Sequence, residues 1–220
     1  IYRRTGVTIK NLNIKTFAYG IHLRESSSIS LENNFASSNS YGIYLYSSSN
    51  NVLNNNTANS NSTGISVSNS RNNTLSGNTM SGNSRSNFSI GASDDLYYDN
   101  NIDTSNLVEG KSIYYIWNVS DQTYDAITNA GVFYCIKCNN VTIDGLSITT
   151  NKKNSNGINL WKTQNSTIKN VILSNNSTGI YLYDSTNNTI TNSTISNNRY
   201  SGILLSSSSN NALTDNKFLS

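Results

Sequence analysis

The sequence predicts an all-β protein, a right-handed single-stranded parallel β-helix, and three observations predict this fold. The motif Gly-Ile-x-Leu or a close variant recurs at intervals of 22 or 23 residues over most of the chain. Apolar residues alternate with polar ones over very short stretches, which Asn, Ser and Gly separate. Proline, which cannot donate a backbone hydrogen bond to a neighbouring strand, is absent. A repeat of this length indicates a solenoid, and the short alternations indicate strands.

The first strand of each coil carries the Gly-Ile-x-Leu motif. The motif or its variant begins at Gly20, Gly42, Gly64, Asn87, Gly157, Gly179 and Gly202. Positions one and three after the glycine are apolar, as in Ile180 and Leu182, so we expect them to point inward and to form ladders from coil to coil. A leucine-rich repeat has a similar period, but it needs a long leucine frame and helical spacing that the sequence lacks.

The second and third strands follow at fixed distances from the glycine. Eleven residues after it stand Leu31, Leu53, Leu75, Tyr98, Ile168, Ile190 and Leu213. Sixteen residues after it stand Ala36, Ala58, Met80, Leu173, Ile195 and Phe218. Between them, position thirteen holds Asn33, Asn55, Gly77, Asn170, Asn192 and Asp215. Because Asn, Asp and Gly tolerate left-handed backbone, we predict a bend at this position.

Length and period predict one β-helix domain over residues 1–220 with one interruption. The period fails at about 105–131, and we predict an insertion there that carries a small β-hairpin. The β-helix resumes at Val132, which takes the place of the motif glycine. Phe133 and Cys135 then point inward, and Ile143 stands at position eleven, in the second strand. Residues 7–11 already match the middle of a coil, so we expect the chain to be a fragment of a longer protein.

Composition excludes several classes of protein. Charged residues are 12% of the chain, and the net charge is only +3. The basic residues are scattered along the sequence, which argues against nucleic-acid binding. No apolar stretch is long enough to span a membrane. Asn, Ser and Thr replace the charges, and they can form tight bends and hydrogen-bond from coil to coil.

The repeat frame, with its Gly-Ile-x-Leu strand and the following Asn-Asn-x-Ile and Asn-x-Ile-Ser segments, resembles a known group. It is similar to the pectin-lyase-like parallel β-helix repeats of the carbohydrate-binding and sugar-hydrolase group. That group includes periplasmic accessory proteins of copper-enzyme maturation and many archaeal surface proteins. Residues 101–115 and 138–143 resemble the surface proteins most. The resemblance implies the fold across the whole chain, and a location at the cell surface, outside the cell or, in a bacterium, in the periplasm.

Few residues have the chemistry of a metal site. Cys135 and Cys138 are the only cysteines and His22 is the only histidine, so a zinc or copper site lacks further soft ligands. We expect either one inward and one bend cysteine or a short disulfide between them. Asp94, Asp95 and Asp99 form the one candidate calcium site, with a solvated acidic bend as the simpler interpretation. We otherwise expect no cofactor.

The outward side of the first strand is the candidate contact surface. Positions two and four after the glycine hold the candidate residues His22, Arg24, Tyr44, Tyr46, Trp161, Tyr181 and Tyr183. Tyr114, Tyr115 and Trp117 of the predicted insertion flank them. Aromatic rings on a rigid sheet are platforms for sugar rings, whereas the simpler interpretation is stacking between neighbouring coils.

Three functions remain open. The first is a non-catalytic cell-surface module that contacts glycans or neighbouring surface subunits, and we favour it over an enzyme. The second is a polysaccharide lyase or glycoside hydrolase, but the outward positions carry no Asp or Glu. The third is a periplasmic metal-enzyme maturation factor. Sequons suggest a secreted glycoprotein, with candidate acceptors Asn61, Asn73, Asn118, Asn165, Asn176 and Asn192.

Overall fold

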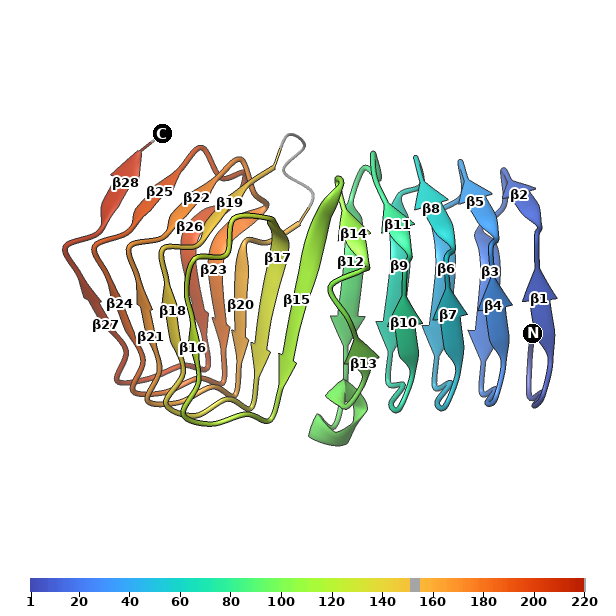
Figure 1. The fold of residues 1–220 in the computed structure, drawn as a ribbon, viewed down its shortest axis with the longest axis horizontal. Coiled ribbons are helices and arrows are strands. Elements are labelled where there is room, and N and C mark those ends of the chain that lie inside the picture. The colour runs from blue at the N-terminus through green and yellow to red at the C-terminus, as the bar shows by residue number, and fades with distance from the viewer. Residues whose placement is uncertain (151–154, 220) are drawn as a thin grey trace. The chain divides into compact units, whose positions relative to one another are not determined.

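A computed structural model describes residues 1–150 and 155–219 of the chain (Figure 1). The described residues form short β-strands and one 3-10 helix, η1 (Asp95–Tyr98), which confirms the predicted all-β parallel β-helix. None of the described helical structure is long and apolar enough to cross a membrane. The chain divides into two compact units, unit 1 (Ile1–Ile113) and unit 2 (Tyr114–Ser220), and each is described by itself.

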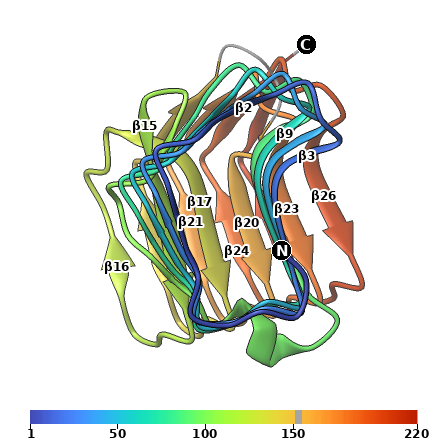
Figure 2. The same ribbon diagram turned by 90° about the vertical axis from the view of Figure 1, so that its right-hand side faces the viewer.

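Unit 1 winds so that each coil gives one strand to each of three sheets. The Gly-Ile-x-Leu sheet contains β3 (Tyr19–Arg24), β6 (Tyr41–Tyr46), β9 (Thr63–Ser68) and β12 (Ser86–Gly91). The second sheet contains β1 (Thr8–Lys10), β4 (Ser30–Glu32), β7 (Val52–Asn54), β10 (Thr74–Ser76) and β13 (Asn101–Ile102). The third contains β2 (Asn13–Lys15), β5 (Phe35–Ser37), β8 (Thr57–Asn59), β11 (Thr79–Met80) and β14 (Leu107–Val108). In Figure 2 the blue and cyan coils of this unit overlie one another.

Unit 2 repeats this arrangement. Its Gly-Ile-x-Leu sheet contains β17 (Ala130–Ile136), β20 (Ile158–Trp161), β23 (Thr178–Tyr183) and β26 (Ser201–Ser206). The second sheet contains β16 (Thr123–Tyr124), β18 (Thr142–Asp144), β21 (Thr167–Lys169), β24 (Thr189–Thr191) and β27 (Ala212–Thr214). The third contains β19 (Ser147–Thr149), β22 (Ile172–Ser174), β25 (Thr194–Ser196) and β28 (Lys217–Leu219).

Residues 105–131 contain regular strands. β14 turns back into β15 (Lys111–Trp117), and the two pair antiparallel through Leu107 with Ser112 and Val108 with Lys111. β14 also pairs parallel with β11, and β16 pairs parallel with β18. This stretch therefore carries a hairpin, and its strands are part of the sheets.

The predicted ladders form the core. Ile43 pairs with Ile21 and Ile65, and all three are buried. In unit 2, Cys135 pairs with Leu160 and Ile143 with Ile168, which confirms the register counted from Val132. In the last coil Leu205, Leu213 and Phe218 keep their ladder positions, but each is more than one-third exposed because no further coil of the described chain covers it.

One predicted ladder residue is wrong. Leu75 pairs with Ile102, not with Tyr98, which lies in η1. The bend between β12 and β13 is longer than in the other coils of unit 1, because it holds η1 as extra chain. A count of eleven residues from Asn87 therefore ends at Tyr98 in η1, before β13 begins.

Left-handed backbone marks the corners of each coil. The predicted bend residues at position thirteen all have positive φ, including Asn33 at 53°, Asn55 at 54° and Asn170 at 55°. Further corners with the same backbone occur where the sequence predicted none, as at Glu25 (51°) and Ser28 (54°). Such a conformation costs a non-glycine residue of the order of 1 kcal/mol, so the stacking of coils must maintain it.

Buried asparagines form hydrogen-bonded ladders along unit 1. Asn56, for example, accepts from the backbone and side-chain nitrogens of Asn34 through Oδ1, at 3.0 and 2.9 Å. Its Nδ2 donates to Leu31 O and to Asn78 Oδ1, at 2.8 and 3.0 Å. Each amide thus satisfies backbone groups at a corner where no strand pairing is available.

The motif glycine is required by close approach of the next coil. A Cβ built on Gly179 would lie 2.5 Å from the carbonyl oxygen of Gly202 and 2.8 Å from Cγ2 of Ile195. Gly20, Gly42, Gly64 and Gly157 show the same approach to the next coil's backbone. The repeat of the motif is therefore a packing constraint on the first strand.

Candidate functional site

Four rings on the outer side of β3 and β6 stack on one another, and we call Tyr19, His22, Tyr41 and Tyr44 the unit 1 ring stack. His22 pairs in register with Tyr44, and their ring centroids are 5.1 Å apart. Tyr19 lies 4.5 Å from His22 and 5.4 Å from Tyr41, and Tyr41 lies 4.9 Å from Tyr44. Interplanar angles of these contacts are only 17° to 26°. The rings therefore pack between coils, and their faces contact other rings.

Sequence reasoning missed Tyr19 and Tyr41. Strict alternation from Ile21 places position 19 on the inner side of the strand. In the structure, a Cβ built on Gly20 would point inward, toward Ala36 and Asn39. The preceding residue, Tyr19, therefore points outward, and its ring lies beside His22. The usable signal was the aromatic residue directly before two of the motif glycines.

Arg24 and Tyr46 lie at the edge of this stack and are exposed. The guanidinium of Arg24 lies 5.3 Å from the ring centroid of Tyr2, and its Nε lies 3.5 Å from Glu25. Tyr46 is tilted by 44° against Tyr44, with the centroids 6.2 Å apart. Arg24 is thus engaged with its own neighbours.

Burial within the stack affects its titratable groups. The pKa of His22 is lowered, first by burial and then by the positive charges of the N-terminal amine and Arg24. The pKa of Tyr44 is raised, with burial as the largest cause. Both shifts favour the neutral ring, which suits a stacked aromatic side chain.

The outer side of unit 2 differs in ring geometry, and we call Tyr134, Trp161, Tyr181 and Tyr183 the unit 2 ring face. Tyr134 meets Trp161 edge to face, with the centroids 6.3 Å apart and the planes at 80°. Tyr181 and Tyr183 are 6.4 Å apart and tilted by 55°. The unit 2 rings thus meet edge to face or at a tilt, unlike the nearly parallel rings of the unit 1 ring stack. Tyr134 is itself buried, at 6% exposure.

The residues of β15 divide between this face and the core. Tyr115 lies 5.9 Å from Tyr134, tilted by 50°. The amine of Lys137 lies 5.6 Å from the ring centroid of Trp117. Tyr114, however, stacks on the fully buried Phe133 at 5.9 Å, so the expectation that it flanks the contact surface is wrong. Alternation along β15 separates it from its neighbours.

Asn159 lies within the unit 2 ring face. It pairs in register with Tyr134 on one side and Tyr181 on the other, and its side chain is buried, at 1% exposure. Its Oδ1 accepts from Nδ2 of Asn156 at 2.9 Å, whereas its own Nδ2 has no hydrogen-bond partner in the described part of the chain. A buried unsatisfied amide costs about 1–3 kcal/mol. Asn159 is thus buried although it stands at the outward position two after a motif glycine.

Soft metal ligands do not come together. Cys135 and Cys138 form a disulfide, which settles the two alternatives drawn from the sequence. Met80 is buried in the core of unit 1, and His22 lies in the ring stack. Across residues 1–150 and 155–219, no group of three or more His, Cys, Asp or Glu side chains is placed to hold a metal ion.

The acidic residues near η1 cap it. Oδ1 of Asp94 accepts from the backbone nitrogen of Leu96 at 2.9 Å, and Asp99 follows the last turn. Asp95 lies in its first turn. The arrangement is that of a capped helical turn.

The candidate glycosylation sites fall into two groups. Asn61, Asn73 and Asn176 are buried, and their Nδ2 atoms donate hydrogen bonds to other coils, so attachment of a glycan would break these bonds. Asn73 is followed by Thr74 and Leu75, so it does not stand in an Asn-x-Ser/Thr sequon. Asn118, Asn165 and Asn192 are exposed at corners with positive φ. The sequence does not distinguish the buried asparagines from the exposed ones, because both recur with the same repeat.

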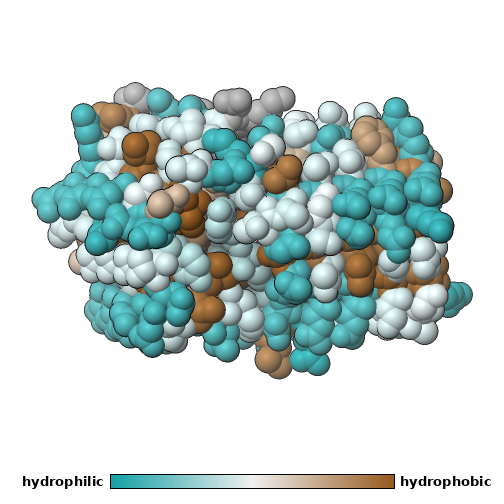
Figure 3. Space-filling view, in the orientation of Figure 1, coloured by the Kyte–Doolittle hydropathy of each residue, from teal (hydrophilic) through white to brown (hydrophobic). Residues whose placement is uncertain are grey.

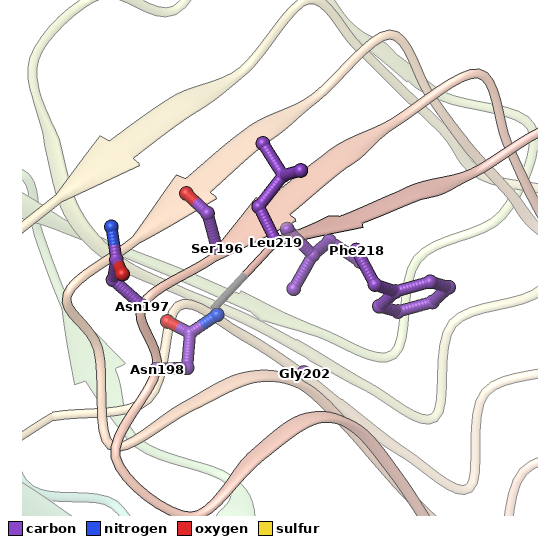
Figure 4. A pocket seen from close by; sticks show the side chains of 7 residues that line it. Ser196, Asn197, Asn198, Gly202, Phe218 and Leu219 are labelled. Atoms are coloured by element: carbon purple, nitrogen blue, oxygen red, sulfur yellow. The ribbon is translucent and has the colours of Figure 1, made fainter.

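A hollow lies at the last coil of unit 2 (Figure 4). Its volume is about 430 Å³, and its lining includes Ile195, Asn198, Gly202 and Phe218. The hollow is the open end of the core. Elsewhere, the face in Figure 3 is mostly hydrophilic or neutral, with scattered hydrophobic residues.

Comparisons with known proteins give a family and distant structures. A family model described as "Periplasmic copper-binding protein (NosD)" matches residues 1–129 and, in a second match, residues 98–220. No curated protein matches the chain.

Solved structures of low identity resemble the chain. The periplasmic alginate epimerase AlgG is 15% identical with a TM-score of 0.47, over 95% of this chain and 50% of that chain. The catalytic domain of a GH87 α-1,3-glucanase in complex with nigerose is 14% identical with a TM-score of 0.48, over 97% of this chain and 54% of that chain. The A-module of the Azotobacter vinelandii mannuronan C-5 epimerase AlgE4 is 14% identical with a TM-score of 0.36, over 98% of this chain and 60% of that chain. The chain thus spans half to three-fifths of these solved chains.

Proposed function

The chain belongs to the NosD family of periplasmic copper-binding proteins, and from this premise we propose that it acts outside the cytoplasm as a non-catalytic module that binds glycans. The site is the unit 2 ring face. The location is the periplasm, which the family description suggests, or the cell surface.

Copper, which the family description implies, does not fit the donors of this chain. Copper sites use imidazole, thiolate or thioether groups held together. The single histidine packs among tyrosines, the cysteines are joined to each other and the methionine is in the core. The proposal therefore assigns no step to copper.

The observation that carries the proposal is the tilt of the rings in unit 2. Flat, amphipathic rings bind sugars when a ring face is open to the ligand, and they lose little side-chain entropy on binding. In the unit 1 ring stack the faces contact other rings, whereas Trp161 meets Tyr134 at 80°. Tyr183 is 42% exposed at the edge of the unit 2 ring face.

A rigid solenoid supports this use of the face. Parallel coils lie about 4.8 Å apart, so rings on successive strands contact successive parts of an extended chain. Each contact is weak, but several contacts on one scaffold add up. The positions of Trp161 and Tyr183, which pair in register, place two rings on neighbouring coils.

The test is affinity gel electrophoresis against a panel of soluble polysaccharides. We expect the wild type to be retarded by at least one of them, and the variant Trp161→Ser/Tyr181→Ser/Tyr183→Ser to migrate freely. Circular dichroism first shows that the variant is folded. Retardation of the variant equal to that of the wild type contradicts the proposal, as does cleavage of a polysaccharide or binding to an envelope protein in place of polysaccharide.

A further inference from the structure

We infer that Asn159 is the residue of the unit 2 ring face that recognises the bound sugar, by donating a hydrogen bond from Nδ2 to a sugar oxygen. The inference rests on the proposed function and adds a recognition residue to it. It follows from the position of Asn159 among the rings and from its Nδ2, which has no acceptor in the described part of the chain.

The register of the strands places Asn159 where an aromatic residue stands on both neighbouring coils. Tyr134 precedes it and Tyr181 follows it in the same column. In unit 1 the corresponding column runs from His22 to Tyr44 and continues with Ser66. Asn159 thus stands between two tyrosines at a position where other coils carry an aromatic ring.

The hydrogen bonds of Asn159 leave a directed donor. Nδ2 of Asn156 donates to Oδ1 at 2.9 Å, which fixes the orientation of the amide. Among the described residues, Nδ2 of Asn159 then has no acceptor. In the buried Asn ladders the equivalent nitrogen has acceptors, as Nδ2 of Asn56 has in Leu31 O and Asn78 Oδ1. Native proteins rarely leave such a donor unsatisfied, and a ligand oxygen supplies the acceptor.

The ligand chemistry follows from the donor and its surroundings. An N–H group between aromatic rings binds an oxygen of a molecule that also stacks on rings, which describes a sugar hydroxyl or a uronate carboxylate. Because Asn159 is almost fully buried, a sugar reaches it only when a neighbouring tyrosine side chain rotates outward. Recognition therefore includes a change of side-chain rotamer at Tyr134 or Tyr181.

The test uses dextran as a neutral probe and alginate as a polyuronate probe, in affinity electrophoresis with the whole chain. Asn159→Leu keeps the size of the side chain and removes the donor, and Thr167→Val on another sheet is the matched control. We expect Asn159→Leu to weaken binding at least tenfold and to leave the melting temperature equal or higher, because it removes a buried unsatisfied amide. Asn159→Asp weakens binding too, and more for alginate than for dextran if the sugar oxygen is a carboxylate.

Each outcome decides the inference. Binding by Asn159→Leu within twofold of the wild type overturns it, and if Trp161→Ser still weakens binding, the proposed function stands. If neither variant changes binding, both fail. If the wild type binds neither dextran nor alginate, the inference is overturned, and the full panel of polysaccharides decides the proposed function. A lower melting temperature with unchanged affinity assigns Asn159 a structural role and also overturns the inference. Should Asn159→Leu not fold, Asn159→Ser replaces it with the same expected loss of binding.

Discussion

Tyr44 stacks on His22 of the preceding coil, with the ring centroids 5.1 Å apart and the planes at 17°. The contact ties two coils of unit 1 together on their outer side, in addition to the backbone pairing of β3 with β6. It also keeps the imidazole in an environment that lowers its pKa, chiefly by burial.

This contact predicts a loss of stability on mild acidification. Because the pKa of His22 in the folded chain lies below its usual value of 6.5, the unfolded chain takes up the proton first. Stability is therefore complete above about pH 6.5 and declines as the pH falls toward the folded pKa. Melting temperatures measured from pH 7.5 to 5 should show this decline, and His22→Phe, which keeps a ring, should remove it. An unchanged decline in that variant would refute the assignment.

The motif glycine predicts a large effect of one methyl group. Gly179→Ala places a Cβ 2.5 Å from the carbonyl oxygen of Gly202, so the coils must separate locally. We expect a loss of about 1–3 kcal/mol or more, as in overpacked cores. Gly91→Ala is the control, since its Cβ would meet nothing within 4 Å. Urea denaturation of both variants is the measurement, and equal midpoints would be incompatible with the packing described.

The asparagine ladders predict a second kind of sensitivity. Asn56→Ala leaves the backbone nitrogen of Asn34 without its acceptor and removes a donor from Leu31 O. With about 1–3 kcal/mol for each buried group left unsatisfied, we expect a loss of about 3 kcal/mol. Asn54→Ala, at a partly exposed strand position, should cost less than about 1 kcal/mol. Similar thermal unfolding of the two variants would show that the ladder contributes little.

The inward and outward positions of β23 predict opposite tolerances. Ile180→Asp puts a charge at a fully buried position, and we expect a loss above about 4 kcal/mol or no folded protein. Tyr181→Ser removes a half-buried ring and should cost about 1 kcal/mol. Calorimetry distinguishes the two, and comparable losses would contradict the register.

The exposed sequons predict selective modification. In a host that attaches N-glycans, peptide mass spectrometry should find glycan on Asn118, Asn165 or Asn192. It should find none on Asn61, whose Nδ2 donates to Ala36 O at 3.0 Å inside the ladder. Occupancy at Asn61 in folded protein would contradict the burial of this ladder.

The repeat made most of the fold predictable, because one spacing determines the strand, the inward residue and the corner of every coil. Ile180, Leu182 and Asn33 were placed correctly on this ground. Prediction failed where a coil departs from the period. The extra turn η1 moved the ladder from Tyr98 to Ile102, and no local pattern indicates how many residues such a bend contains.

The candidate site was less predictable, because it depends on how neighbouring side chains orient. Spacing placed Tyr44 and Trp161 on outward positions, but it could not show that one ring stacks in parallel and the other meets its neighbour at 80°. Nor could it show that Asn159, whose partners in register are Tyr134 and Tyr181, is buried.

The central claim is that the rings of unit 2 bind a ligand whereas those of unit 1 stabilise the fold. The measurement is a paired comparison of Tyr41→Ser/Tyr44→Ser with Trp161→Ser/Tyr181→Ser, each tested for melting temperature and for retardation by the polysaccharide that the wild type binds. We predict that the unit 1 variant melts several degrees lower and keeps its affinity, and that the unit 2 variant loses at least tenfold in affinity with a smaller change in melting temperature. Loss of affinity in the unit 1 variant alone, or equal affinity in both variants and the wild type, would contradict the account.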